Sequence, residues 1–211
     1  MAKTHNVEEG DCISSIAFEN GFFPDTIWNH PNNKTLQEKR KDMNVLMPGD
    51  AVYVPDKRIK NVAQPVDGTY RFKYKGVPAR LNLIIKYYGE PCKSEPYQID
   101  IDGRQTKGTT GADGSINIPI PPDAKKGKLV VGDGDRRVEY VIDLGRLDPI
   151  DQIRGFKQRL ASLGYDPGEL DGDVSEVFKD SIRLFEAENG MRCTGEINDT
   201  NKAKLMEVYG R

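Results

Sequence analysis

The spacing of apolar residues changes twice along this chain, and that change limits its possible folds more than any other feature. Residues 1–56 contain short helical patterns between two extended pieces, residues 68–146 alternate between apolar and polar side chains, and residues 147–211 return to helical spacing. A helix repeats about every 3.6 residues and a strand about every two, so a single bundle or a single sheet is excluded. The sequence therefore predicts a multidomain α+β protein.

The composition is that of a chain with more than one packed core. The 211 residues are 36% hydrophobic and 30% charged, and a shift to Lys, Asn, Gln and Pro indicates a linker at 57–67. We therefore expect an N-terminal module at 1–56, this linker, a β domain at 68–146 and a helical domain at 147–211.

The charge and the apolar runs exclude two classes of partner. The chain has 31 Lys and Arg against 33 Asp and Glu, and the formal net charge of -2 provides no field for a nucleic acid. Met1–Asp11 has no apolar run, and no apolar stretch elsewhere is as long as a membrane span. We expect synthesis in the cytoplasm without a visible signal peptide, no nucleic-acid partner and no membrane insertion.

The first module is predicted to have the order strand, helix, helix, strand. An extended piece at 5–7 leads to a turn, where Asp11 is well placed to cap a helix that Gly21 ends. Asp25 is the expected cap of a second helix. A polar helical stretch, Lys34–Asp42, resembles an insertion before the last strand, Ala51–Pro55.

Two runs in this module resemble the LysM family. Val7–Ala17 matches the opening of a LysM module, and Leu46–Pro55 matches its close. LysM modules bind glycans that contain N-acetylglucosamine in a shallow groove between the loop after the first strand and the loop before the last. The resemblance implies peptidoglycan or a chitin-like glycan as a partner, with Lys34–Asp42 beside the groove. Its glycan-binding candidates are Gly10, Asp11, Cys12, Ile13, Asn44, Leu46, Met47 and Gly49.

The middle segment predicts an antiparallel β-sandwich, because short alternating runs lie between Gly and Pro turns. The run Tyr97–Gly103, followed by Gly108–Ile116 and Ile120–Pro122, resembles Ig-like or transthyretin-like accessory domains. Such domains join modules more often than they catalyse. The expected strands are Tyr70–Tyr74, Leu81–Tyr88 as a buried strand, Tyr97–Ile101, Ser115–Ile120, Lys128–Val131 and Arg137–Leu144.

The last segment predicts a three-helix bundle. Asp148 or Asp151 is the expected cap of the first helix, and Gly164 closes it. A loop rich in Gly and Asp precedes the second helix. The apolar stripes consist of Ile153, Phe156, Leu160 and Leu163 in the first helix, Val177, Phe178, Ile182 and Phe185 in the second, and Ala203, Leu205 and Met206 in the third.

This segment resembles the type 1 peptidoglycan-binding domain over nearly its whole length. The resemblance implies a module that attaches proteins to peptidoglycan, with Tyr165, Asp171 and Asn189 as candidate contact residues. The matching positions are Phe156, Leu160, Leu163–Tyr165, Gly168, Leu170–Gly172, Ser181–Ile182, Phe185, Asn189–Met191 and Thr194–Ile197.

No set of residues indicates catalysis, a metal site or a cofactor. His5 and His30 have no ligand motif around them, and three widely spaced cysteines suggest neither a disulfide framework nor a CxxC site. Cys12 lies near a helix N-terminus, where packing is favoured over a nucleophilic role. Trp28, Tyr53, Tyr165 and Tyr209 are the aromatic residues that could form a carbohydrate platform or pack in a core.

The sequence therefore predicts a non-enzymatic protein that binds or anchors to peptidoglycan. The combination of these three parts also resembles small accessory proteins of type VI secretion or phage-tail-like contractile machines. That resemblance implies the alternative, an adaptor that docks on a spike or effector protein and is delivered by such a machine to the periplasm or outside. The two readings differ in whether the surface contacts a glycan or a protein.

Overall fold

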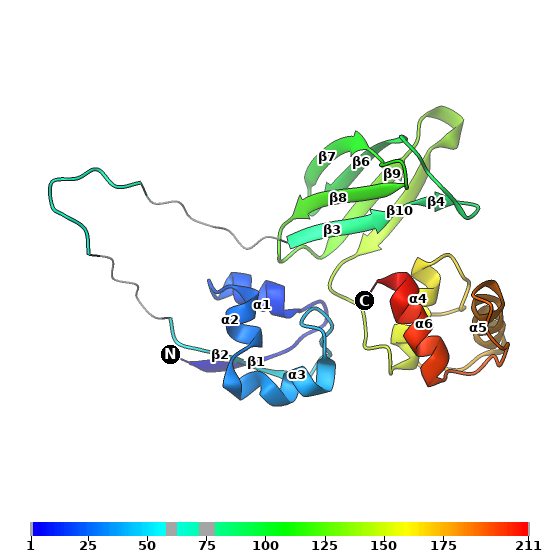
Figure 1. Cartoon of the computed structure of the whole chain (residues 1–211), viewed down its shortest axis with the longest axis horizontal. Helices are drawn as coiled ribbons and strands as arrows, with labels where there is room; N and C mark the ends of the chain where they lie inside the picture. The colour runs from blue at the N-terminus through cyan, green and yellow to red at the C-terminus, as the bar shows by residue number, and fades with distance from the viewer. Residues whose placement is uncertain (1, 58–62, 72–78, 211) are drawn as a thin grey trace. The chain divides into compact units, whose positions relative to one another are not determined.

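The computed structural model describes residues 2–57, 63–71 and 79–210, and it is mixed helix and sheet (Figure 1). Its contacts divide the chain into two compact units, which are residues 1–44 with 48–146 and residues 45–47 with 147–211. Among the described residues, no helix has the length and apolar character needed to cross a membrane.

The N-terminal module has the predicted strand, helix, helix, strand order together with one further helix. Strands β1 and β2 pair antiparallel, with His5 opposite Val52. The stretch predicted at Lys34–Asp42 is helical as far as Arg40. The elements are β1 Lys3–Asn6, α1 Ile13–Glu19, α2 Pro24–Trp28, the short 3-10 helix η1 Pro31–Asn33, α3 Lys34–Arg40 and β2 Ala51–Val54.

The predicted caps of the first two helices are wrong. Cys12, not Asp11, caps α1, because the Ser15 N–H donates to its Sγ at 3.4 Å and the Cys12 N–H donates to Ser15 Oγ at 3.0 Å. Helix α2 begins with Pro24, which needs no capping partner for its nitrogen, so Asp25 lies one residue inside the helix.

Helix α3 is held by polar groups at both ends. At its start the buried Asn33 side chain donates to the carbonyls of Ile27 and Tyr53 at 2.8 Å each and accepts the Tyr53 N–H at 2.8 Å. At its end the Arg40 guanidinium donates to both carboxylate oxygens of Asp50, at 2.6 and 2.8 Å. A helix with almost no apolar stripe is thus fixed by buried hydrogen bonds.

The β domain consists of two sheets that share one core. The order β10-β9-β6-β7 forms one sheet and β3-β8 forms another, all antiparallel, while β4 and β5 form a separate hairpin. Leu81 and Ile118 of one sheet and Ile99 and Leu129 of the other belong to the same buried cluster. The strands are β3 Ala79–Ile84, β4 Lys86–Tyr87, β5 Glu90–Pro91, β6 Pro96–Ile101, β7 Arg104–Thr109, β8 Ser115–Ile120, β9 Lys126–Val131 and β10 Val138–Asp143, with a short 3-10 helix, η2 Gly134–Arg136, before β10.

Two predicted strands and one strand that was not predicted differ from the expected pattern. The run Tyr70–Tyr74 lies largely outside the described residues. The expected buried strand Leu81–Tyr88 is wrong as one element, because β3 ends at Ile84 and Tyr87 and Tyr88 belong to an exposed hairpin. Strand β7 was not predicted, since its residues are polar and five of the six are exposed, as suits a sheet edge.

The C-terminal domain contains the three predicted helices, α4 Ile153–Ser162, α5 Glu176–Glu188 and α6 Asp199–Tyr209. Their shared core is formed by Phe156, Leu160, Phe178, Ile182, Phe185 and Leu205.

Several details of the C-terminal prediction are wrong. Gln152 precedes α4 without a side-chain cap, because Asp148 pairs with Arg154 and Asp151 with Lys202. Val177 and Ala203 lie at exposed positions, outside the buried stripes.

Candidate functional site

The two loops predicted to form a glycan groove in the N-terminal module do lie together. The Ile13 N–H donates to the Met43 carbonyl at 2.9 Å, and the Ser14 hydroxyl donates to Asn44 Oδ1 at 2.9 Å. Gly49 and Val7 are joined by a further backbone hydrogen bond of 2.9 Å. These bonds connect residues about thirty or more positions apart, so only the tertiary fold brings them to one place.

The eight groove candidates differ in how far their side chains are exposed to solvent. Cys12, Ile13 and Leu46 are 9%, 0% and 6% exposed, so their side chains are core and only their backbone is left for a ligand. Gly10 and Gly49 have φ of +92° and +87°, and no atom lies within 4 Å of a Cβ placed at either position. Asp11, Asn44 and Met47 are half-buried.

Two polar pairs that the sequence did not indicate position these loops. His5 Nε2 lies 2.9 Å from Asp11 Oδ2, and the same carboxylate oxygen accepts the Glu8 N–H at 3.0 Å. The pair ties β1 to the loop that follows it. Asp50, whose side chain is 2% exposed, holds Arg40 and also Lys39 at 3.0 Å, so α3 is attached to the turn before β2.

The aromatic candidates of the chain are engaged internally. The Tyr53 ring lies against His30, with ring centroids 4.6 Å apart and the planes tilted by 36°, and Trp28 is half-buried. In the C-terminal domain the Arg159 guanidinium lies 5.6 Å from the centre of the Tyr209 ring. These contacts give the Tyr53 and Tyr209 rings a structural role.

In the C-terminal domain the structure brings Tyr165 and Asn189 close to the same helix end. The Tyr165 ring packs edge-on against Phe185 at 5.6 Å, and its hydroxyl donates to Glu188 Oε2 at 2.7 Å. The Asn189 side chain donates to the Phe185 carbonyl at 2.8 Å, which caps α5. Burial, and then the neighbouring Glu188 carboxylate, raise the pKa of Tyr165, so its hydroxyl stays a proton donor.

Asp171 lies in the loop between α4 and α5 and is held by a buried lysine. Lys157, 1% exposed, donates to Asp171 Oδ1 at 2.6 Å and to the Glu169 carbonyl at 2.9 Å, and its ammonium lies 5.1 Å from the centre of the Phe178 ring. The hydrogen bond from Lys157 holds the pKa of Asp171 below its usual range. The lysine thus fixes the loop from the core side.

A buried carboxylate fixes the second loop of the domain in the same way. Glu186, 0% exposed, accepts the Thr194 N–H at 2.6 Å, the Gly195 N–H at 3.0 Å, the Thr194 hydroxyl at 2.6 Å and the Asn201 side-chain amide at 3.0 Å. Burial alone would raise the pKa of Glu186, but these hydrogen bonds outweigh it and lower the pKa.

The loop that Lys157 holds and the first turn of α5 present apolar side chains to solvent. Leu170, Val174 and Val177 are 47%, 56% and 50% exposed. A Cβ placed on Gly168 would lie 3.8 Å from Val177 Cγ1, so the loop folds back onto the start of α5. We call Leu170, Val174 and Val177 the loop surface; exposed apolar groups on a fixed loop are typical of contact sites.

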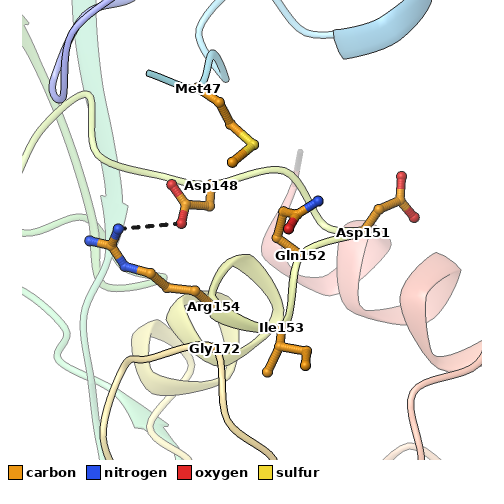
Figure 2. A pocket seen from close by; sticks show the side chains of 7 residues that line it. All are labelled: Met47, Asp148, Asp151, Gln152, Ile153, Arg154 and Gly172. Carbon is orange, nitrogen blue, oxygen red and sulfur yellow. Dashed lines mark ion pairs between the residues drawn. The ribbon is translucent and has the colours of Figure 1, made fainter. Parts of the chain in front are cut away.

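An open pocket lies at the start of α4 (Figure 2). Its three charged lining side chains are all paired, since Arg154 lies 3.5 Å from Asp148 and Asp151 lies 2.9 Å from Lys202. We assign no ligand to it. Its lining residues are Met47, Asp148, Asp151, Gln152, Ile153, Arg154 and Gly172.

In residues 2–57, 63–71 and 79–210, no three His, Cys, Asp or Glu side chains are grouped so that they could hold a metal ion. Cys12, Cys92 and Cys193 are all free.

Comparison with known protein families identifies one segment. Residues 151–205 match the family described as "Putative peptidoglycan binding domain". Searches of curated proteins and of solved structures found no match. The resemblance predicted for the C-terminal segment is therefore confirmed over 151–205, and peptidoglycan binding is the function that this family indicates. The LysM, Ig-like and secretion-machine resemblances stay predictions.

Proposed function

We propose that this protein binds peptidoglycan through its C-terminal domain and its LysM-like module and does so without catalysing a reaction. The observation that carries the proposal is the family match over 151–205, which spans α4, α5 and the larger part of α6. The loop surface supports it further, because its apolar side chains are exposed and Lys157 binds the two residues that flank Leu170.

The N-terminal groove supplies the second contact in this proposal. Its loops are joined by the Ile13 and Ser14 hydrogen bonds, and no atom lies where a side chain would start at the exposed Gly49, so a flat ligand can approach the backbone there. N-acetylglucosamine units present amide groups that backbone N–H and carbonyl groups can recognise. Two weak sites on one chain raise the total affinity when both engage the same polymer.

A second candidate function is the adaptor role, in which a spike or effector protein is the partner. The observation in its favour is α3, a polar insertion attached to the turn before β2 by Asp50. Such a surface is not needed to complete the strand pair, so it is available for contact with a protein.

The test is co-sedimentation of the full chain with insoluble peptidoglycan. We expect micromolar protein to pellet, and the double variant Leu170→Ser, Val174→Ser to bind roughly tenfold more weakly, because two exposed apolar contacts are lost. Leu184→Ser is the matched control, since Leu184 is 52% exposed on α5 and lies outside the loop surface. If wild-type protein stays in the supernatant, the proposal is wrong. The adaptor hypothesis would then be tested by a pull-down experiment.

A further inference from the structure

The β4–β5 hairpin presents two tyrosines that contribute little to the fold. Tyr87 and Tyr88 are 56% and 92% exposed, in contrast to the buried cluster of the β domain. Their rings contact each other edge-on, with centroids 4.6 Å apart. The strands on either side have only two residues each, Lys86–Tyr87 and Glu90–Pro91, so we call residues 86–91 the tyrosine hairpin.

The backbone conformation of the hairpin turn is unfavourable for Tyr88. Tyr87 pairs with Glu90, which leaves Tyr88 and Gly89 as a two-residue turn with φ of +51° and +82°. This turn type favours Asn-Gly or Asp-Gly, because a bulky side chain is rarely found at positive φ. A tyrosine that is nearly fully exposed gains no burial to offset that strain. A strained, exposed aromatic residue is the pattern expected of a contact residue.

We propose that the tyrosine hairpin is a further glycan contact, which binds the sugar chain of peptidoglycan. This inference rests on the proposed function, and it adds a site in a domain for which no ligand was expected. The rings offer apolar faces and hydroxyl groups, and pyranose rings present both C–H faces and hydroxyls, so the two surfaces are complementary.

Shape and charge favour this ligand over other polymers. The turn projects its rings instead of enclosing a pocket, which suits a long chain lying across them more than a small molecule. The flanking Lys86 and Glu90 are both exposed and opposite in charge, so the hairpin has no excess charge for a nucleic acid or an anionic lipid surface. Peptidoglycan, whose stem peptides carry both carboxylates and amines, also contains charges of both signs.

The test uses the full chain with the double substitution Tyr87→Ala, Tyr88→Asn. Asn accepts positive φ, so we expect the unfolding midpoint to be unchanged or higher than that of wild type. We expect the dissociation constant for insoluble peptidoglycan, and for chitin, to rise about tenfold, as is usual when exposed tyrosine contacts are removed.

Two variants serve as controls. Ser94→Asn relieves a positive φ of +53° in the same domain without loss of an aromatic ring, and Val141→Ala trims an apolar side chain that is 83% exposed. Both are expected to bind as wild type does.

Three other outcomes would contradict the inference, and they can be told apart. If wild type pellets and the tyrosine variant pellets equally well, the hairpin is not a glycan contact, while the proposed function stands; a protein partner is then the candidate. If binding falls for peptidoglycan but not for chitin, the hairpin contacts stem peptides and not sugar rings. If wild type fails to pellet, the proposed function and this inference are both wrong.

Discussion

At the scale of single residues, two buried charges organise the C-terminal domain. Lys157 lies four residues after Ile153, and Glu186 lies four residues after Ile182, so each occupies the apolar face of its helix. A charge at such a position is a signal that could have been read from the sequence. Both side chains reach from the core into a loop, where they replace hydrogen bonds that water would otherwise provide.

Glu186 should be the more sensitive of the two to substitution. Glu186→Gln keeps the shape of the side chain but replaces one acceptor oxygen by a donor, which leaves buried N–H groups without a partner. We expect the free energy of unfolding to fall by about 2–3 kcal/mol, measured by urea denaturation. Glu207→Gln is the control, since Glu207 makes a surface pair with Lys204, and its effect should stay within about 0.5 kcal/mol. Equal effects of the two variants would contradict the structural role of Glu186.

The same carboxylate predicts the direction of the acid response. Because the folded-state pKa of Glu186 is lowered, the unfolded chain binds a proton at a higher pH than the folded chain does. The stabilisation is therefore complete above the unfolded pKa of about 4.3 and is lost as the pH falls through the folded value. Urea titrations between about pH 6 and pH 3 should show a shallower loss of stability for Glu186→Gln than for wild type.

At the scale of secondary-structure elements, pattern identified most helices and strands, but local chemistry set their ends. Helix α1 starts after Cys12 and not after Asp11, because the Asp11 carboxylate already binds His5 and the Glu8 N–H. Strand β7 has no apolar alternation, and its position next to β6 comes from backbone pairing together with a Gln98–Gln105 side-chain hydrogen bond of 3.3 Å. Such an edge strand cannot be recognised from hydrophobic periodicity.

Helix α3 should depend on one ion pair. Asp50→Ala leaves the guanidinium of Arg40 without its carboxylate in a buried environment, where the Arg40 side chain is 9% exposed. We expect a loss of about 3 kcal/mol and faster hydrogen exchange of the amides in Lys34–Arg40. Lys39→Ala is the control, because its side chain is 59% exposed, and it should cost less than about 1 kcal/mol. Unchanged exchange in Asp50→Ala would show that α3 is held by other contacts.

At the scale of the whole molecule, the proposal of one binding module at each end makes avidity the property to measure. We expect chains that lack residues 147–211 or residues 1–56 to pellet more weakly with peptidoglycan than the full chain does. The loss should exceed tenfold for the C-terminal deletion, because linked weak sites gain roughly 10²–10⁴ in affinity by acting together. Circular dichroism of each shortened chain checks that its remaining elements are folded. Equal pelleting of all three chains would place the contact in the β domain.

The sequence by itself determined the kinds of element and the family of the C-terminal segment. Helical and alternating spacing are local properties, and the residues around Leu163–Tyr165 and Asn189–Met191 are turn and core positions that a short pattern can reveal. These signals predicted the three C-terminal helices and the segment that the family match confirms.

Only the tertiary structure decided which side chains are available to a ligand. Burial depends on contacts between residues that are far apart in the sequence. These contacts bury the side chains of Cys12, Ile13 and Leu46. The same contacts left Tyr87 and Tyr88 exposed, although their apolar sequence neighbourhood predicted a buried strand. The reason is physical: periodicity reports which face of an element is apolar, whereas the end of a strand and the angle of a turn are set by backbone pairing.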